Sequence, residues 1–341
     1  MAEIKPRVDF YTIELTYRKK EFKTFTDFVC EVGNKKYTYS QSQYLRFMLD
    51  LFMFGLHSNM ANDEQIHKQV GWLNKSANRY RAYCPRVDEK MPMIYGVISG
   101  GRYGRHGMIT EKVENEDDTS TSAIQPSKAI HRYAYFCLYT PLGSKRGCLV
   151  IHSNSRDESI ADALLSFIRK FFAQGNFCHP KVNHFCPKYL QEKFRKNSFL
   201  KQVNLSTSYI DGNIDTIGTT DELSEYDVRI LITPKDKDKG RLGVSAVRKI
   251  IQKFSLLHNK DKKEFENFES RKVTIEDRDT KAVQSFEFDM DDIDLCPRID
   301  VGNILNSEEF QEDGTPQFDS LHTAIKQILV EQVIPELELQ V

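Results

Sequence analysis

The stretch ISGGRYGRHGMITEK (residues 98–112) places four glycines among arginine, tyrosine and histidine. Glycine-rich loops hold phosphates when their glycines lead directly into a helix, as in G-x-G-x-x-G and the Walker loop. Here the spacing from Gly101 is G-x-x-G-x-x-G, and an extended stretch follows instead of a helix. We therefore do not expect a mononucleotide site. Two interpretations stay open: a strand–turn–strand connection, or contact with nucleic-acid phosphates.

The second interpretation uses backbone amides and three side chains of this stretch. Arg102 and Arg105 would supply positive charge to phosphates, and Tyr103 offers an aromatic face for stacking.

The segment FCHPKVNHFC (residues 177–186) places four sulfur and imidazole side chains within nine residues, namely Cys178, His179, His184 and Cys186. Thiolates and imidazoles are the ligands that Zn²⁺ prefers. Structural zinc sites usually separate two ligand pairs by a longer loop, and adjacent ligands would be strained. We expect ordinary, partly buried side chains here and predict neither a metal nor a cofactor.

A third candidate for chemistry is the acidic segment FEFDMDDIDL, whose carboxylates are Asp289, Asp291, Asp292 and Asp294. Such oxygens could bind Mg²⁺ or Ca²⁺, so a metal-dependent nuclease or toxin-like effector is an alternative function. The spacing of common nucleases is missing, and no G-x-S-x-G, H-E-x-x-H or kinase motif occurs. We therefore predict no catalytic residue.

Charge is divided unevenly along the chain. Residues 1–202 hold 31 Lys and Arg against 20 Asp and Glu, whereas residues 203–341 hold 17 against 29. The first part thus carries a net charge of +11, as expected of a protein that binds a polyanion. Two other interpretations stay open: the halves attract each other, or the charges are solvated faces.

Three basic segments carry this hypothesis: aromatic residues are interleaved with the charges of the first two, and Arg248, Lys249 and Lys253 follow the third. The segments are YRKKEFK (17–23), KYLQEKFRKNSFLK (188–201) and PKDKDKGR (234–241). In the last segment, the side chains that we expect to contact phosphates are Lys235, Lys237, Lys239 and Arg241.

Hydrophobic periodicity predicts the elements that position these residues. Strands are expected over 8–17, 91–99, 107–113, 131–141, 146–153, 225–234, 270–276 and 283–290. Helices are expected over 62–74, 160–172, 243–254 and 315–333, the second capped by Ser155 and Glu158 and closed by Gly175. Residues 44–56 fit either a strand or a buried helix.

These elements predict an α+β fold with mixed or antiparallel sheets and packed helices. The length favours two domains: a basic α+β domain at 1–202, and an acidic one with a C-terminal helix at 203–341. Seven cysteines, an odd number, favour reduced thiols over disulfides. With no secretory signal and no apolar run of membrane-spanning length, we expect a cytoplasmic protein.

The segment EYDVRILITPK (225–235), followed by a basic loop, and the aromatic N-terminal strand resemble the RexA family of phage-exclusion proteins. Pro234 and Lys235 are the residues that carry this likeness. Residues 94–172 resemble bacterial proteins of phage-defence islands through a Gly-Gly-x-Tyr-Gly stretch, and are more distantly similar to the KwaB family of the Kiwa system. The residues that match this stretch are Gly100, Gly101, Tyr103 and Gly104.

This resemblance implies a cytoplasmic, homodimeric protein that binds DNA without sequence preference in anti-phage defence by abortive infection or exclusion. A second protein of the defence system is an expected partner. The leading hypothesis is therefore a non-enzymatic DNA-binding component. Two alternative functions stay open: the metal-dependent nuclease or toxin-like effector, and a protein-interaction module whose acidic half binds a basic partner.

Overall fold

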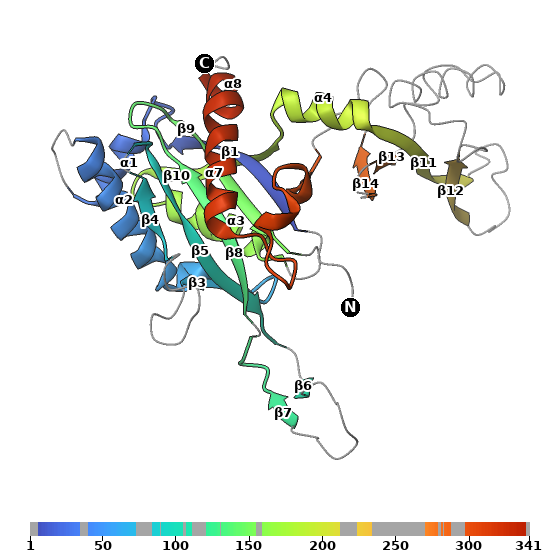
Figure 1. Ribbon diagram of the computed structural model, residues 1–341, viewed down its shortest axis with the longest axis horizontal. Helices are drawn as coiled ribbons and strands as arrows, with labels where there is room; N and C mark the ends of the chain where they lie inside the picture. The colour runs from blue at the N-terminus through green and yellow to red at the C-terminus, as the bar shows by residue number, and fades with distance from the viewer. Residues whose placement is uncertain are drawn as a thin grey trace, which may run out of the picture. The chain divides into compact units, whose positions relative to one another are not determined.

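The computed structural model describes residues 6–34, 40–72, 84–88, 90–104, 107–110, 121–129, 131–154, 159–211, 224–233, 270–278, 281, 283–287 and 297–338. The chain separates into two compact units (Figure 1). Unit 1 comprises Met1–Cys186 and Arg298–Val341, and unit 2 comprises Pro187–Pro297.

Unit 1 is built on an antiparallel nine-stranded sheet in the order β10-β1-β9-β8-β5-β3-β2, with β15 also paired to β1 and β4 to β5. The strands are β1 (Arg7–Tyr17), β2 (Asn62–Asp63), β3 (Lys68–Trp72), β4 (Arg86–Asp88), β5 (Met93–Arg102), β8 (Arg132–Tyr139), β9 (Arg146–Ser153), β10 (Phe177–Phe185) and β15 (Ile299–Asp300). A separate two-stranded sheet joins β6 (Gly107–Thr110) and β7 (Thr121–Ile124).

Three helices cover one face of the nine-stranded sheet: α1 (Phe25–Val32), α2 (Gln41–Leu56) and α3 (Ala161–Phe172), with the 3₁₀ turn η1 (Asn59–Ala61) after α2. Capping boxes start α1 at Thr24 and α2 at Ser40. The core beneath these helices is rich in phenylalanine; for example, the rings of Phe28 and Phe172 lie 5.1 Å apart. Burial of this aromatic surface is the main source of stability for this face.

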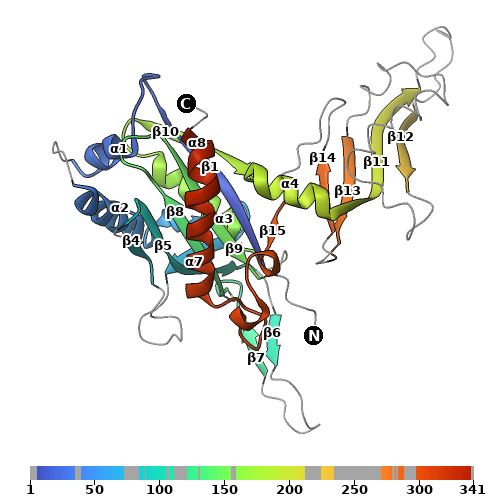
Figure 2. The ribbon, with the colours of Figure 1, turned by 45° about the horizontal axis from the view of Figure 1, so that its top comes forward.

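The C-terminal segment covers the opposite face of the sheet (Figures 1 and 2). It contains η3 (Val301–Asn303), η4 (Ser307–Glu309), α7 (Phe318–Ile328), the π-helical turn η5 (Leu329–Val333) and α8 (Ile334–Glu338). His322 stacks on Tyr95 with ring centroids 3.7 Å apart, and its Nδ1 lies 2.8 Å from the hydroxyl of Tyr135. These contacts orient α7 on the sheet.

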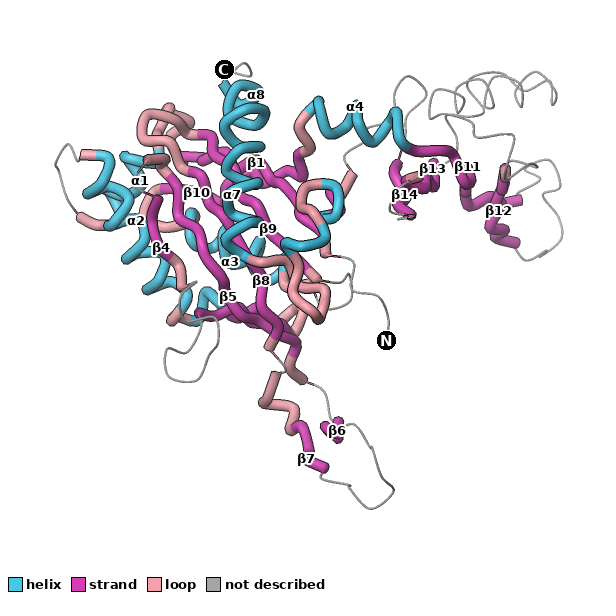
Figure 3. Tube along the Cα trace, in the orientation of Figure 1, coloured by secondary structure: helices cyan, strands magenta, loops and turns pink. Residues whose placement is uncertain are grey.

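Unit 2 holds a four-stranded antiparallel sheet in the order β12-β11-β13-β14, preceded by helix α4 (Lys188–Asn197). Its strands are β11 (Ser198–Asp211), β12 (Ser224–Ile232), β13 (Ser270–Asp277) and β14 (Val283–Glu287). Helix and strand are coloured separately in Figure 3. Two phenylalanines join α4 to this sheet: the rings of Phe194 and Phe286 lie 5.8 Å apart.

The α+β class with antiparallel sheets and packed helices is confirmed. The units, however, differ from the expected division. The boundary expected between residues 202 and 203 falls inside β11, and residues 298–341 belong to unit 1 with the N-terminal part. That each unit folds as a separate domain stays a prediction.

The helix expected over residues 62–74 is wrong. Asn62–Asp63 and Lys68–Trp72 form strands, and Val70 pairs with Gly100 of β5. The residues 44–56, which fitted either element, lie in α2. Ser155, Glu158 and the helix expected at 243–254 lie outside the described residues.

Along the described parts of the chain, no helix is both long and apolar enough to cross a membrane.

Candidate nucleic-acid interface

The loop that joins β1 to α1 is held in a defined shape by hydrogen bonds at both ends. The amide of Lys20 donates to the carbonyl of Tyr17 at 3.0 Å, which closes a tight turn with Lys20 at φ 55°. The amide of Phe25 donates to the carbonyl of Ser144 at 3.0 Å. The loop therefore lies against the turn between β8 and β9, which brings residues 120 positions apart into one surface.

This surface is rich in positive charge, and we name it the β1–α1 surface. Its basic side chains are Arg18, Lys19, Lys20, Lys23, Lys145, Arg146 and Lys181. Lys181 joins it through strand pairing, since it lies opposite Glu14 of β1 in the neighbouring strand β10. Seven cations thus gather at this end of the sheet.

Two carboxylates partly neutralise the surface. Glu14 lies 2.8 Å from the ammonium of Lys145 and 3.4 Å from Arg146, and Glu21 lies 3.7 Å from Lys23. The hydrogen bond from Lys145 and the positive charges of Lys145, Arg146 and Lys181 hold the pKa of Glu14 below its usual value, although burial opposes this. Two further carboxylates border the surface: Glu31, which accepts from the Tyr17 hydroxyl at 3.2 Å, and Asp27, which accepts from the Thr24 amide at 2.7 Å. Counting all four as charged, the surface keeps a net charge of +3.

Four of the cations have side chains that are exposed to solvent. Arg18, Lys19, Lys20 and Lys181 are exposed, and within the described ranges none of them has a carboxylate at ion-pair distance. Phosphates bind to such side chains without regard to base sequence, because the attraction is electrostatic.

An aromatic ring lies among these cationic side chains. Phe22 is 63% exposed, and the ammonium of Lys145 lies 5.8 Å from its ring centroid. The surface thus combines phosphate-binding charge with an apolar face that the fold leaves open to solvent.

Helix α4 of unit 2 shows a similar composition. Its exposed basic residues are Lys188, Lys193, Arg195 and Lys196, against the single acid Glu192. Only Phe194 is buried, whereas Tyr189 is 58% exposed. Because Tyr189, Lys193 and Lys196 are spaced four and seven residues apart, they share one face of the helix.

The glycine-rich stretch is a strand followed by a turn. Gly100 lies in β5, where a Cβ atom would lie 2.6 Å from the carbonyl oxygen of Gln69, so only glycine fits. Gly104 adopts φ +83°, which favours glycine. The amides of Tyr103 and Gly104 donate to the carbonyls of His67 and Pro126 at 2.9 and 2.7 Å. These two amides are therefore occupied by the protein itself.

Of the side chains expected to contact phosphates, two are described. Arg102 is exposed and lies opposite Lys68 of β3, whose ammonium pairs with Asp162 at 2.7 Å. Tyr103 is half-buried, with its ring 5.7 Å from that of His67 and its hydroxyl 3.4 Å from the Asp63 carbonyl. The remaining ones lie outside the described residues: Arg105, Lys235, Lys237, Lys239 and Arg241.

Arg102 and the β1–α1 surface lie at opposite ends of the sheet. Met93, at the start of β5, pairs with Tyr139 beside the β8–β9 turn, whereas Arg102 ends the same strand. A ten-residue strand spans roughly 30 Å. The structure therefore does not bring these two basic groups together.

The cysteines and histidines of β10 are dispersed. Cys178 pairs with Thr16, His179 lies 3.3 Å from the carbonyl of Arg169, and His184 lies 3.5 Å from the carboxylate of Asp9. Cys186 is buried. Over the described stretches of the chain, no three His, Cys, Asp or Glu side chains converge as a metal site would require. The acids Asp289, Asp291, Asp292 and Asp294 lie outside those stretches.

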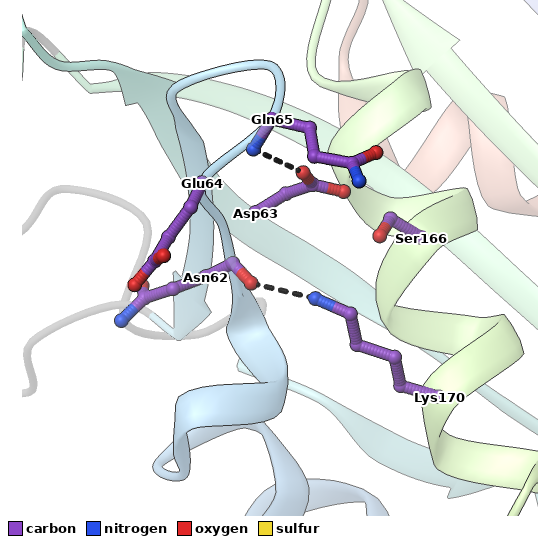
Figure 4. Close-up of a pocket in the computed structure, with 6 residues that line it drawn as sticks. All are labelled: Asn62, Asp63, Glu64, Gln65, Ser166 and Lys170. Atoms are coloured by element: carbon purple, nitrogen blue, oxygen red, sulfur yellow. Dashed lines mark hydrogen bonds between the residues drawn. The ribbon is translucent and has the colours of Figure 1, made fainter.

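A polar pocket of about 500 Å³ lies between the β2–β3 hairpin and α3 (Figure 4). Its lining residues are Asn62, Asp63, Glu64, Gln65, Ser166 and Lys170. A hydrogen bond from Ser166 lowers the pKa of Asp63, although burial opposes this, and Lys170 donates to the Asn62 carbonyl at 2.8 Å. Two carboxylates and one ammonium line the pocket, so it does not suit a polyanion.

Comparisons with protein-family models, with characterised proteins and with solved structures found no match for this chain. The β1–α1 surface and α4 are thus the functional candidates that rest on the geometry. The sequence marked both as basic segments. It did not indicate Lys145, Arg146 and Lys181, because these reach the loop only through a hairpin turn and a strand pairing.

Proposed function

We propose that this protein is a non-enzymatic component of an anti-phage defence system that binds DNA through its phosphates without sequence preference. The observation that carries the proposal is the β1–α1 surface, where seven cations outnumber four carboxylates. Helix α4 adds a second basic surface in unit 2. The role in defence rests on the resemblance to phage-exclusion and phage-defence proteins.

The physical basis is release of counterions. Each phosphate neutralised by a lysine or arginine frees a condensed cation, so the logarithm of the binding constant falls linearly with the logarithm of the salt concentration. The slope is about −0.9 for each phosphate contacted on duplex DNA. A surface with four exposed cations lacking carboxylate partners can make several such contacts.

The test measures binding of a random-sequence duplex by fluorescence anisotropy between about 50 and 300 mM salt, the range over which such binding weakens steeply. Replacing Arg18, Lys19 and Lys20 with alanine should weaken binding. If each of the three contacts one phosphate, the slope of log K against log salt should become less steep by up to about 2.7. The proposal is wrong if neither the duplex nor single-stranded DNA is bound at low salt, or if binding does not weaken as the salt concentration rises.

A charge-matched control removes three exposed cations at the other end of the sheet: Arg102, Lys128 and Arg132. We expect this triple alanine variant to bind nearly as well as the wild type. If binding is lost only in this control, the interface lies at the glycine-rich end and the β1–α1 surface is excluded.

A further inference from the structure

Phe22 is one of two largely exposed phenylalanines among the described residues, the other being Phe54 of α2. The core of unit 1 buries Phe25 and Phe28 completely only a few positions later. Phe22 instead stays 63% exposed, in a loop whose other residues are nearly all charged. A cationic loop that also exposes an aromatic ring offers a ligand both charge for its phosphates and a face for stacking.

The loop presents this ring in an ordered way. The turn closed by Lys20 and Tyr17 precedes Phe22, and the hydrogen bond from Thr24 N to Asp27 Oδ2, 2.7 Å long, follows it. Lys145 stands beside the ring. Because the backbone is restrained on both sides of Phe22, a ligand that contacts the ring has little of the loop left to order.

We infer that the β1–α1 surface takes single-stranded nucleic acid, with Phe22 as the platform on which one unpaired base stacks. This inference rests on the proposed function and names its substrate class. In a duplex the base faces are already stacked on one another, so an exposed ring finds no partner there. In a single strand each base has a free face, and flanking cations hold the backbone.

The surface has the two parts that sequence-tolerant single-strand binding requires. Arg18, Lys19 and Lys20 supply charge just before Phe22 in the loop. The ammonium of Lys145, which also pairs with Glu14 at 2.8 Å, lies 5.8 Å from the ring centroid. A stacked base on the ring places the adjoining phosphates near both groups. The shared chemistry is an unpaired base with its phosphates, which both single-stranded DNA and single-stranded RNA provide.

The experiment compares 20-nucleotide single strands of DNA and of RNA with the matching DNA duplex, using anisotropy at fixed salt. We expect at least one of the single strands to bind more tightly than the duplex. Phe22→Ala should weaken single-strand binding about 5- to 150-fold, the range for loss of one stacked base, and leave the salt slope unchanged. The matched control is Phe54→Ala, because Phe54 is 72% exposed on α2, outside this surface.

A fluorescent version reports stacking directly. Since the chain has one tryptophan, Trp72, the double variant Phe22→Trp with Trp72→Phe carries a single fluorophore at the site. Addition of single strands should quench its emission, whereas duplex should not. If Phe22→Trp still binds single strands, binding requires an aromatic ring at this position and does not require phenylalanine itself.

The outcomes separate this inference from the proposed function. Salt-dependent binding that is equal for single strand and duplex, and unaffected by Phe22→Ala, overturns the inference and leaves the proposed function standing. Failure to bind any nucleic acid overturns both. Vesicles of phosphatidylcholine with phosphatidylserine form the last arm: binding to them through Phe22, without binding to nucleic acid, also overturns both and assigns the loop to membranes.

Discussion

At the scale of single residues, two histidines tie the stability of the fold to pH. His152 is fully buried, and within the described parts neither ring nitrogen has a hydrogen-bond partner. Burial lowers the pKa of His152 to about 3, and burial also lowers the pKa of His322 to about 4. Both rings are therefore neutral in the folded protein at neutral pH.

We predict that the free energy of unfolding falls as the pH drops below about 6.5, the usual pKa of histidine. Below that value the unfolded chain takes up protons that the folded chain does not, so each histidine costs about 1.4 kcal/mol per pH unit until its folded pKa is reached. His152→Leu should reduce this slope, as measured by urea unfolding between about pH 7 and pH 5. Equal slopes in His152→Leu and the wild type would contradict the prediction.

Residue types alone predicted the chemistry of the basic segments but not the contacts of each side chain. Tyr103 was expected to offer a stacking face, yet its ring lies against His67 and its hydroxyl near the Asp63 carbonyl. The sequence pattern indicated Phe22 only as one aromatic residue of the basic segment 17–23. Its exposure depends on how the loop packs, which local sequence does not encode.

At the scale of elements, α1 and the loop before it are positioned by close packing on β9. A Cβ atom on Gly147 would lie 2.4 Å from the carbonyl oxygen of Tyr139 and 3.0 Å from the ring of Phe25. Gly147 therefore allows the first turn of α1 to approach the sheet, and this approach also places the β1–α1 loop beside the β8–β9 turn.

We predict that Gly147→Ala lowers the free energy of unfolding by about 1–3 kcal/mol, because the backbone or the Phe25 ring must shift. Gly143→Ala in the same hairpin meets nothing within 4 Å and should change stability by less than about 0.5 kcal/mol. Urea titration of both variants measures the difference. Two equal values would show that the contact at Gly147 does not restrain α1.

Several strands, among them β1, β5, β8 and β9, and the helices α3 and α7 could be predicted, because each has a clear hydrophobic period. Helix α2 fitted either element, and the long strands β10 and β11 were not predicted. The expected hairpin at 131–153 is confirmed by β8 and β9, and the expected helix at 160–172 by α3. The error at residues 62–74 has a physical cause. Asn62 and the acids after it resemble a helix start, but strand pairing of Val70 with Gly100 outweighs that local preference.

At the scale of the whole molecule, residues 187–297, which form unit 2, interrupt the chain of unit 1 between β10 and β15. The chain leaves after β10, where Phe185 pairs with Phe10, and returns in β15, where Ile299 pairs with Val8. These partners are two residues apart on β1, about 7 Å along the strand. Arg298 and His184 both lie near the buried carboxylate of Asp9, at 3.6 and 3.5 Å.

We predict that unit 1 folds without unit 2. Replacing residues 187–297 with a four-residue glycine–serine linker, which can span about 13 Å, should leave a cooperative unfolding transition, because the strand ends are already adjacent. Circular dichroism and urea unfolding test this. The shortened chain should also keep the effect of Phe22→Ala on single-strand binding. Insolubility or a non-cooperative transition would show that unit 1 depends on residues 187–297.

The sequence by itself determined the α+β class, several of the strands and the segregation of charge. It also determined the basic segments of the β1–α1 loop and of α4. These features follow from composition and hydrophobic periodicity. Only the tertiary structure decided which of those charges share a surface. It joined Lys145, Arg146 and Lys181 to the β1–α1 loop, placed Arg102 at the far end of the sheet, and returned residues 298–341 to unit 1. The physical reason is that strand pairing and burial act between residues far apart in the chain, whereas patterns in the sequence report only near neighbours.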